Sequence, residues 1–264
     1  MTHRSDDTAV RRLRDGAAVT LAITSGATDA ISILTLGGAF TSVMTGNLVL
    51  LGVSIGHADS GLARQIGVAV IGYIAGCAVG ARITGTPAHG EGVWPAAVTR
   101  GLAVEAALFS LYAAGWWAAG GRPSGAATAA LLGLCALALG IQSSSVNRFG
   151  VMGLSTTYLT GTLTTLVIRL ANGGRFRDVA RHFLLLVALL SGAAIATALL
   201  ALQVRAVVPL VQLVPLGAVV VIATTVAAAS RLGRVRQVGG RIDETNAASG
   251  PSDGSPTGKH SDCD

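Results

Sequence analysis

Asp29 is the residue of this 264-residue chain best suited to chemistry, because it carries a charge inside an otherwise apolar segment. If that segment crosses a membrane, the carboxylate costs about 3 kcal/mol on insertion scales, so such residues usually face a polar cavity or a partner. We therefore predict that Asp29, together with Thr28, binds a proton or a cation. The alternative is that Asp29 forms hydrogen bonds as a helix cap or as a link between helices near Gly26.

A neutral polar cluster begins at Gln142, two residues after Gly140, and continues to Ser145. These side chains have ample hydrogen-bonding capacity and no charge. Gln142 could therefore be the neutral partner of Asp29 in a binding site. Hydrogen bonding between helices, with no ligand, is the other interpretation of the same cluster.

Two Thr-Gly pairs, Thr45-Gly46 and Thr160-Gly161, lie inside short apolar segments. Glycine and hydroxyl residues in a membrane helix allow bending, local unwinding or close packing. Unwound backbone can coordinate ions, whereas close packing would give the glycines a structural role only. The predicted solute- or ion-binding residues are Asp29, Thr28, Thr45, Asn47, Gln142, Thr157, Thr160 and Thr162, and the predicted structural breaks are Gly26, Gly46, Gly140 and Gly161.

Glu105 is the second acidic residue inside a long apolar stretch. Arg100 lies five residues earlier, which is a poor spacing for an ion pair on one helix. We expect Glu105 to form an ion pair with another helix or to lie near the membrane interface.

The Gly-x-Ser-x-Gly spacing of a nucleophile elbow occurs at residues 52–56 and 250–254. The first lies inside an apolar segment and the second in the polar tail, so neither follows a strand as such an elbow requires. The sequence has no phosphate-binding glycine loop with its lysine and no His-Glu-x-x-His. The five histidines are scattered through tails and joints, and the three cysteines form no spaced pair. We therefore expect no catalytic site, no metal centre, no disulfide and no cofactor.

The surrounding elements are predicted from composition. Hydrophobic residues make up 51% of the chain and charged residues 12%, with a mean hydropathy of +0.63. A membrane span needs about 20 mostly apolar residues. These values predict an all-α membrane protein, a helical bundle of six to eight spans. The apolar segments are 17–36, 40–56, 62–81, 95–118, 126–145, 153–171, 183–203 and 207–230.

Three landmarks repeat at offsets of 114 or 115 residues and divide the membrane part into two related halves. Gly26 and Gly140 are 114 residues apart, as are Pro95 and Pro209, while the threonines of the two Thr-Gly pairs are 115 apart. The predicted organisation is a loose basic tail at 1–14, membrane repeats at 15–121 and 122–232, and a disordered tail at 237–264.

The basic residues predict orientation. With eight spans, 15 of the 19 Lys and Arg residues lie on the side of the N-terminus, and with six spans 16 of 19 do. Both counts place the two termini in the cytoplasm. Four crossings per half would give parallel repeats and three would give inverted repeats. Because the formal charge of +6 comes mainly from arginines at segment ends, we expect no nucleic-acid partner.

The same motifs resemble the YoaK family of bacterial membrane proteins, which is built on a domain of unknown function. The resemblance covers about residues 15–230 and implies a multi-pass membrane protein, without an established activity. The matching motifs are Gly26-x-x-Asp29-Ala30, Phe40 to Met44-Thr45-Gly46-Asn47, Gly140-Ile141-Gln142 and Ser155-Thr156-Thr157-Tyr158-Leu159-Thr160-Gly161-Thr162-Leu163.

Taken together, these features favour a secondary-transporter-like protein. It would hold a small solute or ion near the membrane midplane, where the two Thr-Gly breaks meet, and Asp29 would be its proton-sensitive group. The alternative is a membrane scaffold or accessory subunit that transports nothing, in which the same motifs only pack helices together.

Overall fold

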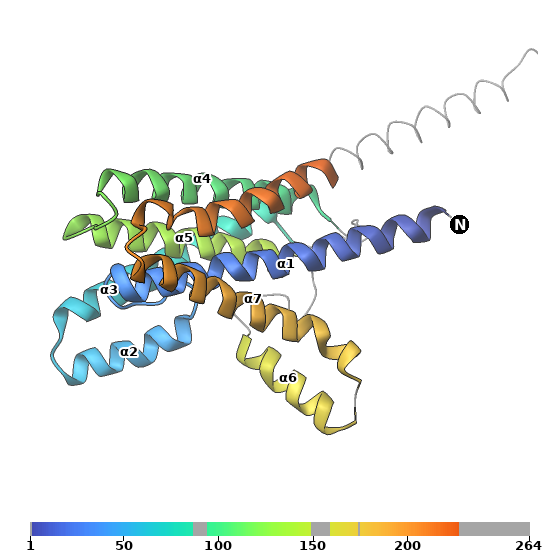
Figure 1. Ribbon diagram of the computed structural model, residues 1–264, viewed down its shortest axis with the longest axis horizontal. Helices are drawn as coiled ribbons and strands as arrows, with labels where there is room; N and C mark the ends of the chain where they lie inside the picture. Colours follow the sequence, from blue (N-terminus) through green and yellow to red (C-terminus); the bar gives the residue numbers. More distant parts are fainter. Residues whose placement is uncertain (1, 87–93, 149–158, 174, 227–264) are drawn as a thin grey trace, which may run out of the picture. The chain divides into compact units, whose positions relative to one another are not determined.

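The structure is a computed structural model that describes residues 2–86, 94–148, 159–173 and 175–226 (Figure 1). Every regular element in these ranges is helical. The predicted all-α fold is therefore confirmed. The predicted C-terminal tail at 237–264 lies outside the described residues, so its prediction is unaffected.

Six of the described helices are long and apolar enough to cross a membrane, which confirms a polytopic membrane protein. The short segments of the sequence give two helices of 13 residues each. At 1.5 Å per residue each is about 20 Å long, less than the roughly 30 Å of the hydrocarbon core. The long helices are α1 (Thr2–Thr35), α3 (Ser60–Thr84), α4 (Ala96–Ala118), α5 (Ala126–Asn147), α7 (Phe176–Ala201) and, after the short η2 (Arg205–Val207), the helix of residues 210–226; the short ones are α2 (Met44–Gly56) and α6 (Leu159–Ala171).

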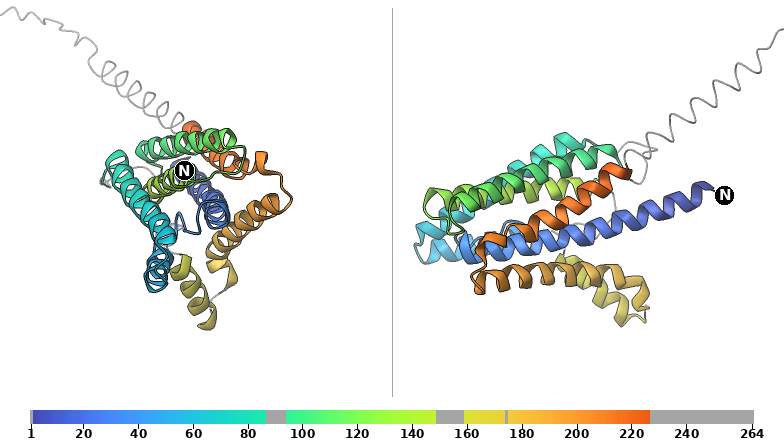
Figure 2. Two further views of the ribbon diagram at one scale, coloured as in Figure 1. Left: turned by 90° about the vertical axis from the view of Figure 1, so that its left-hand side faces the viewer. Right: turned by 45° about the horizontal axis from the view of Figure 1, so that its top comes forward.

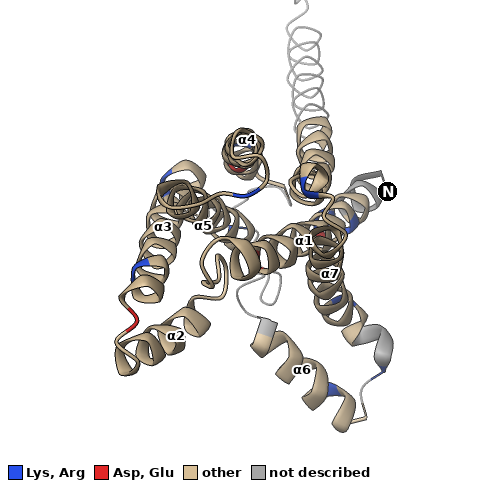
Figure 3. Ribbon diagram, turned by 60° about the vertical axis from the view of Figure 1, so that its left-hand side comes forward, with Lys and Arg blue, Asp and Glu red and all other residues tan. Residues whose placement is uncertain are grey.

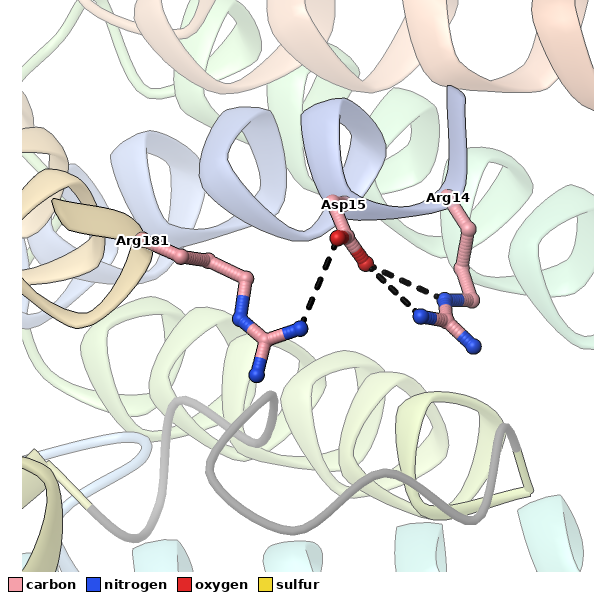
Figure 4. A network of polar contacts seen from close by, with 3 residues as sticks. All are labelled: Arg14, Asp15 and Arg181. Carbon is pink, nitrogen blue, oxygen red and sulfur yellow. Dashed lines mark hydrogen bonds and ion pairs between the residues drawn. The ribbon is translucent and has the colours of Figure 1, made fainter. Parts of the chain in front are cut away.

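The prediction of a loose tail at 1–14 is wrong, because α1 already begins at Thr2. No glycine or proline precedes Gly16, so nothing in the local sequence breaks the helix that continues into the membrane span. Asp15 accepts hydrogen bonds from Arg14 at 2.9 Å and from Arg181 of α7 at 3.4 Å (Figure 4). This network fastens the first half of α1 to the start of α7.

Successive long helices run in opposite directions (Figure 1). α4 and helix 210–226 are antiparallel neighbours, since the Trp116 ring nitrogen donates to the Arg205 carbonyl at 2.8 Å and the Thr99 hydroxyl meets the Ala223 carbonyl at 3.5 Å. α1 runs beside α7 in the same direction, and α3 runs beside α5 (Figure 2). As a consequence, α1 and α5, the first helices of the two predicted halves, run in opposite directions.

Glycines bring α1 and α7 into backbone contact. A Cβ atom on Gly26 would overlap the Leu189 carbonyl oxygen, and one on Gly192 would overlap the Ile23 carbonyl oxygen. α1 is continuous through Gly26, so the predicted break at this residue does not occur. Glycine is needed here because only a residue without Cβ lets two helix backbones approach so closely.

The pair α3 and α5 is built in the same way. A Cβ atom on Gly140 would overlap the Tyr73 carbonyl oxygen, and one on Gly76 would overlap the Leu137 carbonyl oxygen. α5 is also continuous through Gly140, so the break predicted there is wrong for the same reason. Each pair is therefore held by two reciprocal glycine contacts.

The core lies where α1, α4 and α5 meet helix 210–226. Phe109, Tyr112 and Trp116 are fully buried on one face of α4, with ring centroids 6.4 and 6.0 Å apart. Large apolar side chains such as Ile71 and Leu190 are exposed on the outer faces of α3 and α7. Exposed apolar side chains on spanning helices are expected where the helices contact lipid.

Candidate functional site

Asp29 holds the connection between α1 and α2. The chain leaves α1 after Thr35 and folds back, so that the backbone N–H groups of Thr41 and Ser42 donate to Asp29 Oδ1 at 2.7 and 2.9 Å. The Thr41 hydroxyl donates to Oδ1 at 2.8 Å, and the Ser42 hydroxyl donates to Oδ2. Asp29 is 7% exposed. This geometry is that of a buried hydrogen-bonded anchor, and a ligand-binding role for Asp29 stays a prediction.

Asn47 fastens the other end of the same connection. Its side-chain amide pairs with both backbone groups of Phe40, accepting from the Phe40 N–H at 2.9 Å and donating to its carbonyl at 2.8 Å. Gly46 lies in the first turn of α2, and a Cβ atom there would come within 3.2 Å of the Phe40 ring. The predicted break at Gly46 is thus displaced to residues 36–43, where Gly37 and Gly38 have φ angles of 101° and 83°.

The segment 36–56 enters the bundle and returns to the end from which it came. Thr41 lies level with Asp29, which is six residues, or about 9 Å of helix, before the end of α1. α2 then runs back to that end, where Asp59 caps the first turn of α3 by accepting from the Leu62 N–H at 2.9 Å (Figure 1). The segment is therefore a re-entrant hairpin.

The two Thr-Gly motifs do not form one buried site. α2 packs on α3 and α6 packs on α7, and the two short helices extend from different sides of the bundle (Figure 3). The side chains of Thr45 and Thr160 are exposed. Gly161 has open space around it inside the continuous α6, so the break predicted at this residue does not occur either. Thr162 is buried, and Thr157 lies outside the described residues.

Four buried side chains from four helices form what we term the interior polar layer: Thr28 of α1, Tyr112 of α4, Cys135 of α5 and Gln212 of helix 210–226. The Gln212 amide donates to the Thr28 hydroxyl at 2.9 Å, and that hydroxyl donates to the Thr24 carbonyl at 2.7 Å. Tyr112 lies near both Gln212 and Cys135.

The layer continues along α1 in both directions. Asp29 lies near Cys135 and follows Thr28 directly, so the anchor of the hairpin borders the layer. In the other direction, Gln142 of α5 donates to the Leu21 carbonyl at 3.3 Å. Of the predicted site residues, the structure therefore brings Thr28, Asp29 and Gln142 to the interior.

Several polar atoms in this interior have no hydrogen-bond partner among the described residues. Buried polar atoms in proteins usually have a partner, so a group of exceptions calls for an explanation. The unpartnered atoms are Thr24 Oγ1, Ser25 Oγ, Glu105 Oε1 and Oε2, Tyr112 Oη, Gln142 Oε1 and Gln212 Oε1. Their concentration makes this interior the candidate site.

Glu105 does not have the environment that the sequence predicts for it. It is 0% exposed, and neither of its oxygens has a hydrogen-bond or ion-pair partner in the described part of the chain. The expected interhelical ion pair is therefore absent there, and Arg100 is exposed. Tyr112, seven residues later and so on the same helix face, was the available signal that Glu105 points inward.

Comparison with known proteins gives the family. The family described as "Protein of unknown function (DUF1275)" matches residues 17–226. The chain belongs to this family. A family relative, the UPF0700 transmembrane protein YoaK of Bacillus subtilis (strain 168), is 34% identical over 164 residues, which cover 62% of this chain and 70% of the relative. No solved structure matches the chain.

The match to the DUF1275 family covers all six long helices up to the end of helix 210–226, apart from the first turns of α1. It includes the hairpin, the interior polar layer and Glu105. The site described above is therefore within the family domain. The resemblance to YoaK proteins read from the motifs is confirmed, and it assigns no activity.

Proposed function

We propose that this chain is a secondary-transporter-like membrane protein that binds a small solute or ion in the interior polar layer. The observation that carries the proposal is the group of buried, unpartnered polar atoms on four helices, two of them in the layer and the others in the interior around it. In an apolar core such atoms cost about 1–3 kcal/mol each, so they are retained where they serve binding. Hydroxyl, amide and carboxyl groups together suit a small polar solute or a monovalent ion.

An inverted repeat would give this site its alternating access. The glycine contacts of the pair α1/α7 match those of the pair α3/α5, with offsets of 114 residues between α1 and α5 and 116 between α3 and α7. The equivalent helices run in opposite directions, and transporters of this kind bind substrate where their inverted halves meet. In our proposal the two glycine-locked pairs move as units around the polar layer.

The arginine distribution supports a bacterial inner-membrane orientation with cytoplasmic termini. The start of α1 and the end of helix 210–226 lie at the same end of the bundle (Figure 1). With six spans, 16 of 19 basic residues belong to that side. Basic residues favour the cytoplasmic side of bacterial spans.

Transport by the reconstituted full-length chain tests the proposal. Vesicles would be screened for uptake of monovalent cations, amino acids and sugars, with and without a pH gradient. Thr28→Val and Gln212→Leu should each lower the flux about tenfold, the equivalent of one lost hydrogen bond. The control is Thr225→Val, because the hydroxyl of Thr225 also bonds to its own helix, at the Ile222 carbonyl, but is exposed.

Two results would contradict the proposal. Folded, reconstituted protein that moves none of these solutes under any gradient would remove its basis. Flux that falls equally in the Thr225→Val control would mean that the polar layer has no special role.

A non-transporting scaffold is the second candidate, and one observation favours it. All the hydrogen bonds of Asp29 and Asn47 described above hold the hairpin in place, as expected of packing devices. A stable stoichiometric partner recovered in mild detergent, combined with no solute flux, would support this function over transport.

A further inference from the structure

Glu105 is the most isolated ionisable group in the described part of the bundle. It lies on the inward face of α4 between Leu102 and Phe109, both of which are fully buried. Both carboxyl oxygens are without a described partner, whereas Asp29 accepts four hydrogen bonds. The two buried carboxyl groups of this bundle therefore have opposite hydrogen-bonding environments.

The depth of Glu105 follows from the contacts of α4. Gly101 packs against Ser145 and Gly115 packs against Leu131, so Glu105 lies at the level of residue 141 in α5. Gln142 is the next residue, and its Oε1 is also unpartnered. Glu105 therefore lies about two turns of α4, or roughly 10 Å, from Tyr112 and the interior polar layer.

Few charged or titratable groups face Glu105 from its neighbours. Helix 210–226 contains none. On α5, Cys135 faces Tyr112 instead, and Arg148 donates to the Thr84 carbonyl at 3.0 Å, nearer the beginning of α4. On α3, the Tyr73 hydroxyl donates to Ser143.

The remaining titratable groups of these helices lie elsewhere. Cys77 of α3 contacts Tyr73 and Ser144, and Arg82 is exposed. Asp29 of α1 lies near Cys135, at the level of Tyr112. No described cation is thus paired with Glu105, and no described donor stabilises its charged form.

We infer that Glu105 carries a proton in this state and is the proton-coupling group of the bundle. A bare carboxylate in an apolar interior costs several kcal/mol, whereas the protonated acid is neutral. The reaction is a single proton transfer. A carboxylate oxygen takes a proton from water on one side of the membrane to form an O–H bond, and returns it to water on the other side, with no other bond changed.

This inference rests on the proposed function for its coupling role, because a protonated carboxyl couples transport only if the bundle alternates between the two sides. Whether the Glu105 carboxyl group holds a proton does not depend on transport. The two parts can therefore be tested by separate measurements on the same protein.

Infrared spectroscopy of the full-length protein in lipid vesicles at neutral pH tests the proton. The wild type should show the carbonyl band of a protonated carboxyl group that is absent from Glu105→Gln. The matched control Asp29→Asn should retain the band. Glu105→Asp keeps an acid at the same place, so it should show the protonated-carboxyl band at a shifted frequency. This variant replaces Glu105→Gln in the test if Glu105→Gln does not fold.

Two infrared results would overturn the inference: no protonated carboxyl band in the wild type, or a band that survives in Glu105→Gln. Proton flux into the same vesicles, followed with an internal pH dye, tests coupling, and Glu105→Gln should reduce it at least tenfold. If the band depends on Glu105 but no proton or solute flux occurs, Glu105 is protonated and the transport proposal is wrong. If solute flux occurs but the band is absent, the transport proposal stands and Glu105 is not protonated.

Discussion

At the scale of single residues, Asp29 and Glu105 show that burial alone does not decide what a carboxyl group does. Asp29 is buried with two backbone N–H groups and two hydroxyl groups around it, so its charge is stabilised and serves to hold a hairpin. Glu105 is buried among apolar side chains. Desolvation disfavours the charge of both carboxyl groups. For Asp29 the four donors offset this cost, so it can serve as an anchor, whereas for Glu105 nothing offsets it, which favours the protonated form of a proton carrier.

Replacing Asp29 by Asn should loosen the hairpin. The new amide keeps one accepting oxygen but presents an NH₂ group to a donor, so we expect a loss of about 2–3 kcal/mol in the free energy of unfolding. Denaturant unfolding of the purified protein in detergent, followed by circular dichroism, measures it. The control Asp59→Asn should change stability by less than about 0.5 kcal/mol, because Asn is an equally good N-cap. Equal stability of both variants would refute the anchoring role.

Replacing Asn47 by Ala should leave the N–H and carbonyl of Phe40 without partners. The expected cost is about 1–3 kcal/mol, and it should be local. Hydrogen exchange followed by mass spectrometry should become faster in residues 36–43. The exposed Asn172 provides a control, and Asn172→Ala should leave the exchange of this segment unchanged.

At the scale of elements, the glycines act between helices and not within them. Gly26 and Gly140 each lie in an unbroken helix, and each contacts a backbone carbonyl of the partner helix. The two contacts have the same geometry in both helix pairs. This correspondence is the strongest structural support for treating the pairs as equivalent units.

Alanine at Gly26 or Gly140 should therefore push two helix backbones apart. We expect each substitution to lower the free energy of unfolding by about 1–3 kcal/mol or more. Gly67→Ala is the matched control in α3, since a Cβ there meets nothing within 4 Å. It should be neutral or stabilising by up to about 1 kcal/mol. A large loss in one of the two pairs only would argue against their equivalence.

At the scale of the whole molecule, the re-entrant hairpin sets the number of crossings in the first half of the chain. Because 36–56 returns to the end of the bundle where it began, the connection at 57–59 lies opposite the N-terminus, and the C-terminal end of α3 lies on the N-terminal side. An eight-span chain would place both points on the opposite sides. The directions of α3, α4 and α5 relative to α1 therefore depend on this segment.

Cysteine labelling in intact cells distinguishes the two topologies. In a protein lacking Cys77, Cys135 and Cys263, we expect Ala58→Cys to react with a membrane-impermeant maleimide from outside. Thr86→Cys should react only after the membrane is permeabilised. Both positions are exposed, so access depends on the side of the membrane alone. Labelling with the opposite pattern would contradict six spans with cytoplasmic termini.

By itself, the sequence determined that this is a helical membrane protein, because hydrophobic length is a local property that a single segment expresses alone. It also identified Asp29 and Gln142 as polar residues of the interior. It singled out Gly26 and Gly140, but as breaks and not as the contacts between helices that they form. Tertiary structure decided what these residues contact: Asp29 bonds to Thr41 and Ser42, while Glu105 has no described partner. The physical reason is that a polar atom's role depends on which donors reach it, and those donors come from chain segments whose positions only packing fixes.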